Sequence, residues 1–156
     1  MSTLSFRWAR LHELTALEWH AVLAAREAVF IVEQNCPYQD ADALDAHSWH
    51  LIGTCDGQLA AYLRAVDPGR KSVHAGTFYA EPSIGRVLTA TAFRGKGFGQ
   101  QLMHEGITGC ERYFPGQGIR ISAQSYLLNF YRVLGFVEVG DEYDEDGIPH
   151  FEMRRD

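Results

Sequence analysis

Three glycines within five residues mark one place in this 156-residue sequence where a ligand could lie against bare backbone. Residues 94–99 read R-G-K-G-F-G and precede an apolar, helix-like segment. Glycine permits backbone conformations that other residues avoid, and it lets another group approach the main chain closely. Backbone N–H groups at a helix start bind anions, helped by the helix dipole. The pattern predicts a site for a phosphate-bearing ligand, with Arg94 adding a charge-assisted contact.

Two common phosphate-binding motifs do not fit this stretch. A P-loop requires G-x-x-x-x-G-K-[S/T], whereas Lys96 lies between glycines and no Ser or Thr follows it. A dinucleotide fingerprint requires G-x-G-x-x-G/A, but its last position falls on Gln100 or Leu102, depending on the starting glycine. These failures disfavour a nucleotide-binding α/β protein. The pattern that fits is [R/Q]-x-x-G-x-[G/A], through Arg94, Gly97 and Gly99.

The elements expected around this loop are those of a mixed α/β domain. Apolar runs predict strands at residues 5–11, 48–54, 58–66, 84–89, 119–123, 136–143 and 149–154. Helical patterns predict helices at about 15–33, 97–113 and 125–134. Residues 67–83 are expected to be a connection with one irregular strand. No repeat or linker divides the chain, so we expect a single domain over residues 1–156.

Charge and composition disfavour several classes of binding partner. The formal net charge of −6 disfavours nucleic acid, since phosphate binding usually needs a basic face. No apolar stretch approaches the roughly 18 residues of a membrane span, and the first residues lack a signal-peptide pattern. Cys36, Cys55 and Cys110 are odd in number and lack C-x-x-C spacing. We therefore expect free thiols, no metal site and a reducing cytoplasm.

A second motif follows the glycine loop: residues 129–136 read N-F-Y-R-V-L-G-F. Together with R-x-x-G-x-G and the element order, it resembles the GNAT superfamily of N-acetyltransferases along nearly the whole chain. Residues 30–40, F-I-V-E-Q-N-C-P-Y-Q-D, are similar to a stretch of the ElaA-like acyltransferase subgroup. I-G-R-V from Ile84, A-Q at 123–124 and D-G-I-P-H from Asp146 resemble the rest of its signature. One departure is a connection at 67–82 longer than usual in the subgroup.

The resemblance implies the GNAT acyl-CoA N-acyltransferase fold. This is an α/β fold with a mixed central sheet of six to seven strands, splayed fourth and fifth strands, and about four flanking helices. It also implies a cytoplasmic enzyme that transfers an acetyl group from acetyl-CoA to a primary amine by direct attack in a ternary complex. The acceptor would be a small-molecule or peptide amine, and edge strands near the C-terminus could form a homodimer. The alternative is a non-catalytic acyl-CoA-binding or sensor module of the same fold.

The resemblance further assigns the residues that bind the cofactor. The pyrophosphate would lie over the backbone of residues 95–99, and the pantetheine arm would pass between strands 84–89 and 119–124. There it would pair with backbone near Leu88 like an added strand. The expected set is Val87, Leu88, Thr89, Arg94, Gly95, Lys96, Gly97, Phe98, Gly99, Gln100, Asn129 and Tyr131.

Attack of an amine on a thioester needs an oxyanion donor, a proton donor and a deprotonated amine. By resemblance, a backbone N–H near Val87 or Leu88 would stabilise the oxyanion, and Tyr131 would protonate the thiolate. A lysine-like amine, with a pKa of about 10.4, needs a base or a water relay at neutral pH. Glu33 and His150 rank first as bases, followed by His50 and Glu142. For Tyr131, His50 and His150, a structural role in the core is the competing interpretation.

The acidic residues at 40–45 and 141–146 favour a cationic acceptor through charge complementarity. The run D-A-D-A-L-D from Asp40 lacks the glycine and the glutamate of a calcium loop, so no calcium site is expected there.

Overall fold

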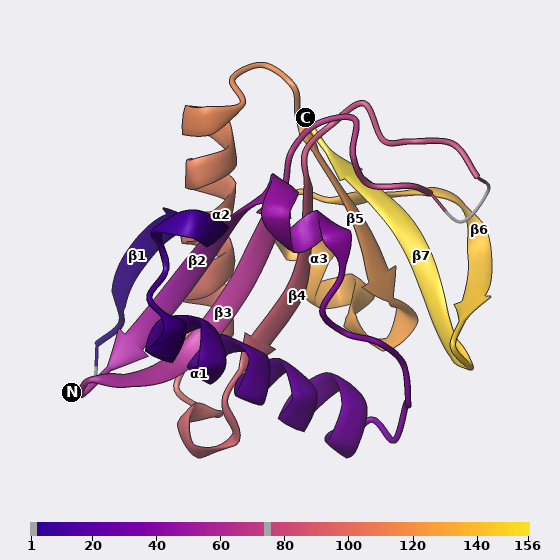
Figure 1. Ribbon diagram of the computed structural model, residues 1–156. Helices are drawn as coiled ribbons and strands as arrows, with labels where there is room; N and C mark the ends of the chain where they lie inside the picture. The colour runs from indigo at the N-terminus through magenta and orange to yellow at the C-terminus, as the bar shows by residue number, and fades with distance from the viewer. Residues whose placement is uncertain (1–2, 74–75) are drawn as a thin grey trace.

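Figure 1 shows a computed structural model that describes residues 3–73 and 76–156. The described residues form a sheet of seven strands in the order β1-β2-β3-β4-β5-β7-β6. The strands are β1 (Ser5–Arg10), β2 (Ser48–Cys55), β3 (Gln58–Val66), β4 (Ser83–Thr89), β5 (Ile119–Gln124), β6 (Val137–Glu145) and β7 (Ile148–Arg155). Each lies within a few residues of a predicted strand.

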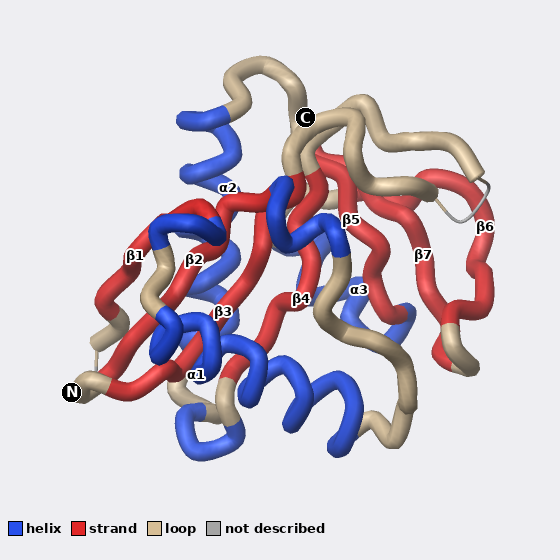
Figure 2. Tube along the Cα trace, viewed as in Figure 1, coloured by secondary structure: helices blue, strands red, loops and turns tan. Residues whose placement is uncertain are grey.

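Helices cover both faces of this sheet (Figures 1 and 2). They are α1 (Ala16–Arg26), α2 (Phe98–Tyr113) and α3 (Leu128–Val133), with short 3-10 turns between other elements. Leu102 and Met103 of α2 pack with Leu63 of β3, whereas Val22 of α1 packs with Tyr62 beside it. Successive strand residues point to opposite faces, so α1 and α2 lie on opposite sides of β3. No helix among the described residues is long and apolar enough to cross a bilayer.

The first predicted helix changes its winding before it ends. Thr15 caps it through a capping box with Glu18, as the sequence indicates. After Arg26 the chain widens into a π-helical turn that runs from Glu27 to Glu33. Such turns are frequent at functional sites, and this one ends beside the glycine loop. The predicted helix at 125–134 is also shorter, because residues 125–127 form a 3-10 turn before α3.

The sheet opens between β4 and β5. These two strands are parallel, and the pairing within the described strands is at Ser83 and Arg120. Past this point their backbones separate, as the ribbon shows from the middle of β4 downward (Figure 1). A bulge in β4 accompanies the opening: Tyr62 pairs with Leu88 but Arg64 pairs with Gly85, so β4 carries one extra residue. The splay expected of the fourth and fifth strands is therefore present.

The connection before β4 folds back on itself as a short ribbon. Ser72 and Phe78 form a β-bridge, and the Tyr79 amide donates to the Lys71 carbonyl at 2.9 Å. Tyr79 anchors the ribbon, because its hydroxyl donates to Glu152 of β7 at 3.0 Å. Through Tyr79, the described part of the long connection thus reaches β7 on the opened side of the sheet.

Candidate functional site

A cleft of about 720 Å³ occupies the gap between β4 and β5. The π-helical turn, the loop that follows it, α3 and the β6–β7 hairpin supply the other walls. Six of the residues expected to bind the cofactor line this cleft: Val87, Leu88, Thr89, Arg94, Gly99 and Tyr131. The cleft also takes in the two first-ranked bases, Glu33 and His150. The structure thus brings residues from distant segments of the sequence to one cavity.

The glycine loop connects the end of β4 to α2. Gly95 and Gly97 have φ angles of +79° and +77°, and Gly97 is the residue that caps the start of α2. A left-handed backbone of this kind is strained for other residues, so both glycines are required by conformation alone. Only Gly99 has a helical backbone, and a Cβ there would lie 3.8 Å from the Thr89 hydroxyl. Close approach of a ligand therefore stays a prediction for Gly99, and it is not needed to explain Gly95 and Gly97.

Arg94 and Glu33, which the sequence assigned to separate roles, form one ion pair. The Arg94 Nη1 and Nη2 atoms donate to the two carboxylate oxygens of Glu33 at 2.6 and 2.8 Å. Arg94 Nε also donates to the Thr89 carbonyl at 3.2 Å, which holds the guanidinium against the end of β4. The hydrogen bonds from Arg94 lower the pKa of Glu33. A carboxylate that holds a guanidinium in this way is a weak proton acceptor.

Tyr131 places its ring between the core and the cleft. It is 8% exposed, packs edge-on against Phe130 and Phe136, and lines the cleft. Burial raises the pKa of its hydroxyl to about 12, so the phenol stays protonated at neutral pH. The structural interpretation therefore applies, because Tyr131 is a core aromatic. The residue also borders the cleft, and its catalytic role stays a prediction.

His150 lies on the opposite wall, on β7 next to β5. Its Nδ1 lies 2.7 Å from the Ile148 carbonyl, which can only accept, so Nδ1 carries the proton. The other ring nitrogen, Nε2, lies 3.3 Å from a carboxylate oxygen of Glu145. In the neutral ring Nε2 holds a lone pair that can take a proton, and Glu145 would then face the resulting positive charge.

The other candidates lie away from the cleft. His50 is fully buried and bonds the Tyr62 hydroxyl at 2.7 Å and the Asp45 carbonyl at 2.9 Å, which is the structural role proposed for it. Glu142 is exposed and accepts a hydrogen bond from Ser125 at 2.8 Å. Asn129 accepts from Arg132 at 3.2 Å on the outer side of α3. Gly95, Lys96, Gly97, Phe98 and Gln100 also lie outside the cleft lining, and the Phe98 side chain is buried in the core.

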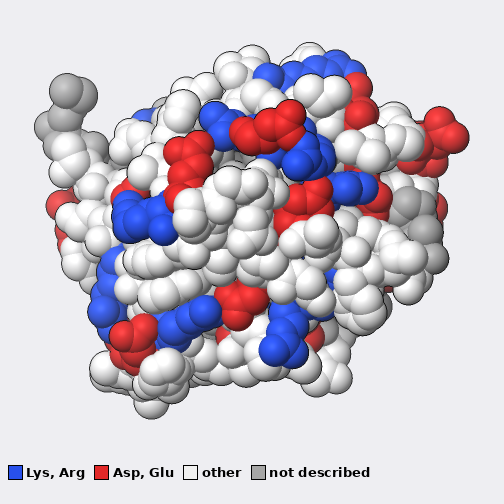
Figure 3. Space-filling view, turned by 90° about the horizontal axis from the view of Figure 1, so that it is seen from above, with Lys and Arg blue, Asp and Glu red and all other residues white. Residues whose placement is uncertain are grey.

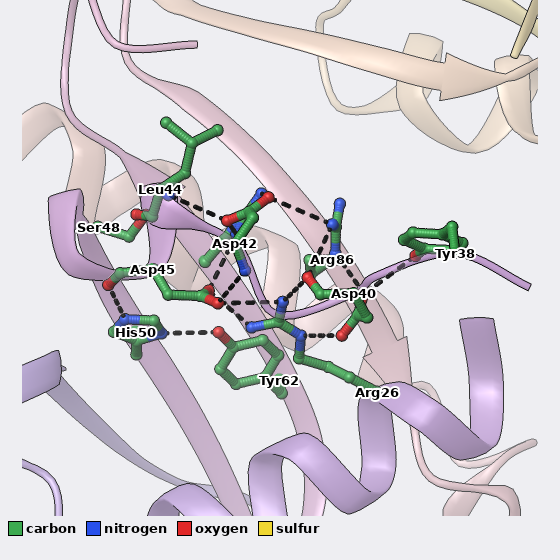
Figure 4. Close-up of polar contacts among 11 residues, drawn as sticks. Arg26, Tyr38, Asp40, Asp42, Leu44, Asp45, Ser48, His50, Tyr62 and Arg86 are labelled. Atoms are coloured by element: carbon green, nitrogen blue, oxygen red, sulfur yellow. Dashed lines mark hydrogen bonds and ion pairs between the residues drawn. The ribbon is translucent and has the colours of Figure 1, made fainter. Parts of the chain in front are cut away.

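A largely buried network of three arginines and three aspartates lies at the cleft (Figure 4). Its members Asp42, Arg64 and Arg86 line the cleft at the Gly85 side of β4, whereas the glycine loop follows the other end of that strand. Arg26 is fully buried, and its guanidinium nitrogens lie 2.7 Å from carboxylate oxygens of Asp40 and of Asp45. The remaining members are joined by further ion pairs: Arg64 with Asp42 and Asp45, and Arg86 with Asp40 and Asp42. We call these six residues the arginine–aspartate network. Arg86 adopts a left-handed φ of +52° at the β4 bulge, where its side chain turns toward the network.

The network changes the electrostatic expectation for the acceptor. The three carboxylates at 40, 42 and 45 are each bonded to arginine, so the group as a whole carries no net charge. Burial by itself would raise the pKa of Asp45, but hydrogen bonds and charge from Arg26, with the charge of Arg64, outweigh it and lower the pKa. The cationic acceptor expected from the acidity of residues 40–45 therefore loses that support. Figure 3, which views the molecule from above, also shows acidic and basic side chains interspersed on that face.

Sequence reasoning did not identify this network. It took the aspartates as acidic residues that favour a cationic acceptor, and it gave no role to Arg26, Arg64 or Arg86. The spacing D-A-D-A-L-D shows three carboxylates on a short loop, but it carries no information about partners on α1, β3 and β4. Only the fold brings those arginines together.

Comparison with known proteins places this geometry in a family. A family model described as an acetyltransferase (GNAT) domain matches residues 28–156. A UPF0039 protein of Synechocystis is 44% identical over 151 residues, covering 96% of this chain and 94% of the relative. The protein ElaA of Escherichia coli is 40% identical over 154 residues, covering 96% and 95%.

Solved structures agree with the sequence relatives. An acyl-CoA N-acyltransferase from Pseudomonas aeruginosa superposes with a TM-score of 0.88 and 42% identity, covering 99% of this chain and 100% of the other. The crystal structure of Escherichia coli ElaA gives the same TM-score with 36% identity and the same coverage. The expected resemblance to ElaA-like proteins and the expected fold are both confirmed.

Proposed function

The chain belongs to the GNAT acetyltransferase family, and from this membership we propose that it transfers an acetyl group from acetyl-CoA to a primary amine. Membership supports acyl-CoA-dependent acyltransfer; the acetyl group, the acceptor and the mechanism are our proposals. The observation that carries them is the cleft between β4 and β5, lined by Tyr131 and reaching Gly99 of the glycine loop.

The donor would occupy the open seam. Backbone near Leu88 lies on the β4 side of the cleft, where an extended pantetheine arm could pair with it in place of β5. The pyrophosphate would then reach the backbone N–H groups at the start of α2, with Arg94 beside it. Glu33 already holds the Arg94 guanidinium, so its proposed role is to orient this cation.

The reaction would be direct attack of the amine on the thioester carbonyl. The bulge in β4 leaves its extra residue outside the regular ladder, so a backbone N–H near Val87 or Leu88 is available to the developing oxyanion. Collapse of the tetrahedral intermediate breaks the C–S bond, and Tyr131 donates its phenolic proton to the departing thiolate.

His150 is the better of the two proposed bases. Its Nε2 lies 3.3 Å from Glu145, which also lines the cleft, and it would take a proton from the attacking amine. Glu33 is less suited, because Arg94 lowers its pKa and occupies both of its oxygens. A proton lost by the amine would pass to His150 directly or through a water.

Calorimetric titration with acetyl-CoA tests the proposal first. The wild type should bind saturably, and Gly97→Trp should not, because a large side chain at the helix start blocks the anion site. Gly116→Trp is the matched control, since Gly116 has a similar φ of +74° and also has open space around it. Loss of binding in both variants, or no binding by the folded wild type, would count against the site.

Release of free CoA thiol then separates an enzyme from a non-catalytic acyl-CoA-binding module. Bound acetyl-CoA should be consumed when primary amines are offered. If acetyl-CoA binds but no amine of a broad panel accelerates thiol release, the sensor interpretation is correct.

The proposed compartment is the cytoplasm, and a homodimer is the proposed assembly. Cys36, Cys55 and Cys110 are buried free thiols, as a reducing compartment favours. Strand β6 lies at the edge of the sheet with Val137 and Val139 exposed, which offers a surface for a second copy. Sedimentation analysis of the wild type and of Val137→Lys would test this.

A further inference from the structure

We propose that the end of the cleft formed by Lys71, Arg64 and Arg86 binds a carboxylate group, and that the acceptor is therefore an amine that also carries a carboxylate. This rests on the proposed acyl transfer and names the substrate class of the same cleft. The three cations come from the ribbon before β4, from β3 and from β4, and all three line the cleft.

Lys71 differs from the other two cations of this group in its partners. Among the described residues it makes no ion pair, although the neighbouring guanidiniums Arg64 and Arg86 each have carboxylate partners. Burial, together with the like charges of Arg64 and Arg86, lowers the pKa of its ammonium group. The charges of Glu145 and Asp42 act in the opposite direction, but neither carboxylate forms an ion pair with Lys71 within the described residues. A partly buried ammonium next to two guanidiniums would be stabilised further by an anion in direct contact.

Arg64 offers a second donor at the same place. It is 1% exposed, and its Nη atoms are taken by Asp42 and Asp45. Its Nε is buried and has no hydrogen-bond partner within the described residues. A buried N–H of this kind costs free energy unless a partner arrives. Because this N–H has almost no contact with solvent, a carboxylate at Lys71 would accept from it only after the Arg64 side chain shifts.

The negative charges of the cleft do not replace such a ligand. Asp42 is bonded by two nitrogens of Arg64 at 2.7 and 3.1 Å, so its charge is already matched. Glu145 is half exposed on the β6–β7 hairpin and lies beside His150. The cation without an ion pair is thus partly buried, whereas Asp42 is paired and Glu145 lies near solvent. Coulomb attraction is stronger away from water, so the partly buried cation determines the preference.

Backbone contacts of the connection before β4 hold Lys71 in place. Its carbonyl accepts from Tyr79, and the neighbouring Ser72 pairs with Phe78, so residue 71 sits in the short ribbon. Tyr79 is tied in turn to Glu152 on β7. The long connection before β4 therefore delivers a cation to the cleft, which gives this segment a function.

Matched amines test the proposal. Thiol release from acetyl-CoA would be compared for glycine and glycinamide, β-alanine and β-alaninamide, and 4-aminobutyrate and its amide. For at least one spacing, the carboxylate should have a kcat/KM about tenfold or more above that of its amide, as for a charge-assisted hydrogen bond. The amide's amine loses its proton more easily, so amine acidity works against the expected preference.

Two variants locate the effect. Lys71→Met should bring the carboxylate's kcat/KM down to that of the amide and leave the amide rate and the affinity for acetyl-CoA unchanged. Arg70→Met removes the cation of the adjacent, exposed residue and should leave the preference intact. Equal rates for acids and amides at every spacing, or a preference that survives Lys71→Met, would overturn the carboxylate site while acyl transfer stands.

A binding measurement keeps the two proposals separate. If acetyl-CoA is not consumed with any amine, the proposed function fails. The site is then tested by calorimetric titration of N-acetyl-β-alanine and N-acetyl-4-aminobutyrate against their amides. Binding of an acid but not its amide, lost in Lys71→Met, supports the site; equal binding, or none, overturns it.

Discussion

The glycine loop and the arginine–aspartate network lie at opposite ends of one cleft but are built in different ways. The loop consists of consecutive residues, and its backbone conformation is fixed by Gly95 and Gly97. The network gathers charged side chains from α1, the loop after it, β3 and β4. The loop end is exposed, with Arg94 and Glu33 side chains 41% and 45% accessible, whereas Arg26 is fully buried. The glycine loop is therefore formed locally and lies in solvent, whereas the arginine–aspartate network depends on the whole fold.

The largest expected effect of this contrast is on stability. Arg26→Met should lower the free energy of unfolding by about 3–5 kcal/mol, because it leaves Asp40 and Asp45 buried beside an uncharged side chain. Urea denaturation would measure the change. Arg132→Met is the matched control, since its ion pair with Glu138 is on the surface and its loss should change stability little.

If Arg26→Met is nearly neutral, the contrast between the two ends disappears. Should the variant fail to fold, Arg86→Met gives a milder version of the test, because Arg86 is partly exposed and keeps fewer buried contacts.

The next largest effect is expected on the catalytic rate, with stability unchanged. Tyr131→Phe should lower kcat about 10²-fold through loss of the proton donor, with acetyl-CoA affinity unchanged. Stopped-flow measurement of thiol release gives kcat. Tyr126→Phe is the control, because Tyr126 also lines the cleft but its side chain is largely exposed. Full activity in Tyr131→Phe would assign the residue to the core alone.

A substitution in the glycine loop should change the affinity for acetyl-CoA. Arg94→Met is expected to weaken acetyl-CoA binding roughly tenfold, as for loss of a charge-assisted hydrogen bond, with little change in stability. Arg112→Met removes an exposed cation elsewhere on α2 and should have no effect on calorimetric affinity.

Glu33→Gln separates orientation from base catalysis. Arg94 lowers the pKa of Glu33, so this carboxylate is ionised throughout the range in which the amine reaction runs. The acid limb of kcat/KM should therefore keep its midpoint in Glu33→Gln. A midpoint that moves in this variant, but not in His150→Gln, would return the role of base to Glu33.

The same contrast explains which features of the fold and the site could be predicted from the sequence. The strands, α2 and the glycine loop were predictable because their signals are local: apolar periodicity, turn residues and a short motif. Tyr131, which the family resemblance assigned to the cofactor site, and His150, one of the candidate bases, both line the cleft. The pairing of Glu33 with Arg94 was not predictable, because it joins residues 61 positions apart at the end of a π-helical turn. A role for Lys71 was not predictable for the same reason, because it depends on the neighbouring residues of β3 and β4, which only the fold brings close.

The smallest expected effect concerns His50, which borders the network through the Asp45 carbonyl. Burial lowers the pKa of His50 in the folded protein, whereas the unfolded chain should titrate near 6.5. As pH falls below about 6.5, the unfolded state takes up a proton that the folded state does not, so stability decreases toward acid pH. The slope should approach at most about 1.4 kcal/mol per pH unit for one such group. Urea denaturation at several pH values between about 5 and 7.5 would reveal it.

His50→Gln should flatten that slope, at some cost in stability from imperfect hydrogen bonds to Tyr62 and Asp45. His104→Gln, on the exposed side of α2, should leave the slope unchanged. A wild-type slope that persists in His50→Gln would mean that other groups dominate the acid response. The loop end contains no buried histidine in the part of the chain described, so Arg94→Met should keep the wild-type slope. Acid sensitivity would then belong to the buried end of the cleft, where charge is held away from water.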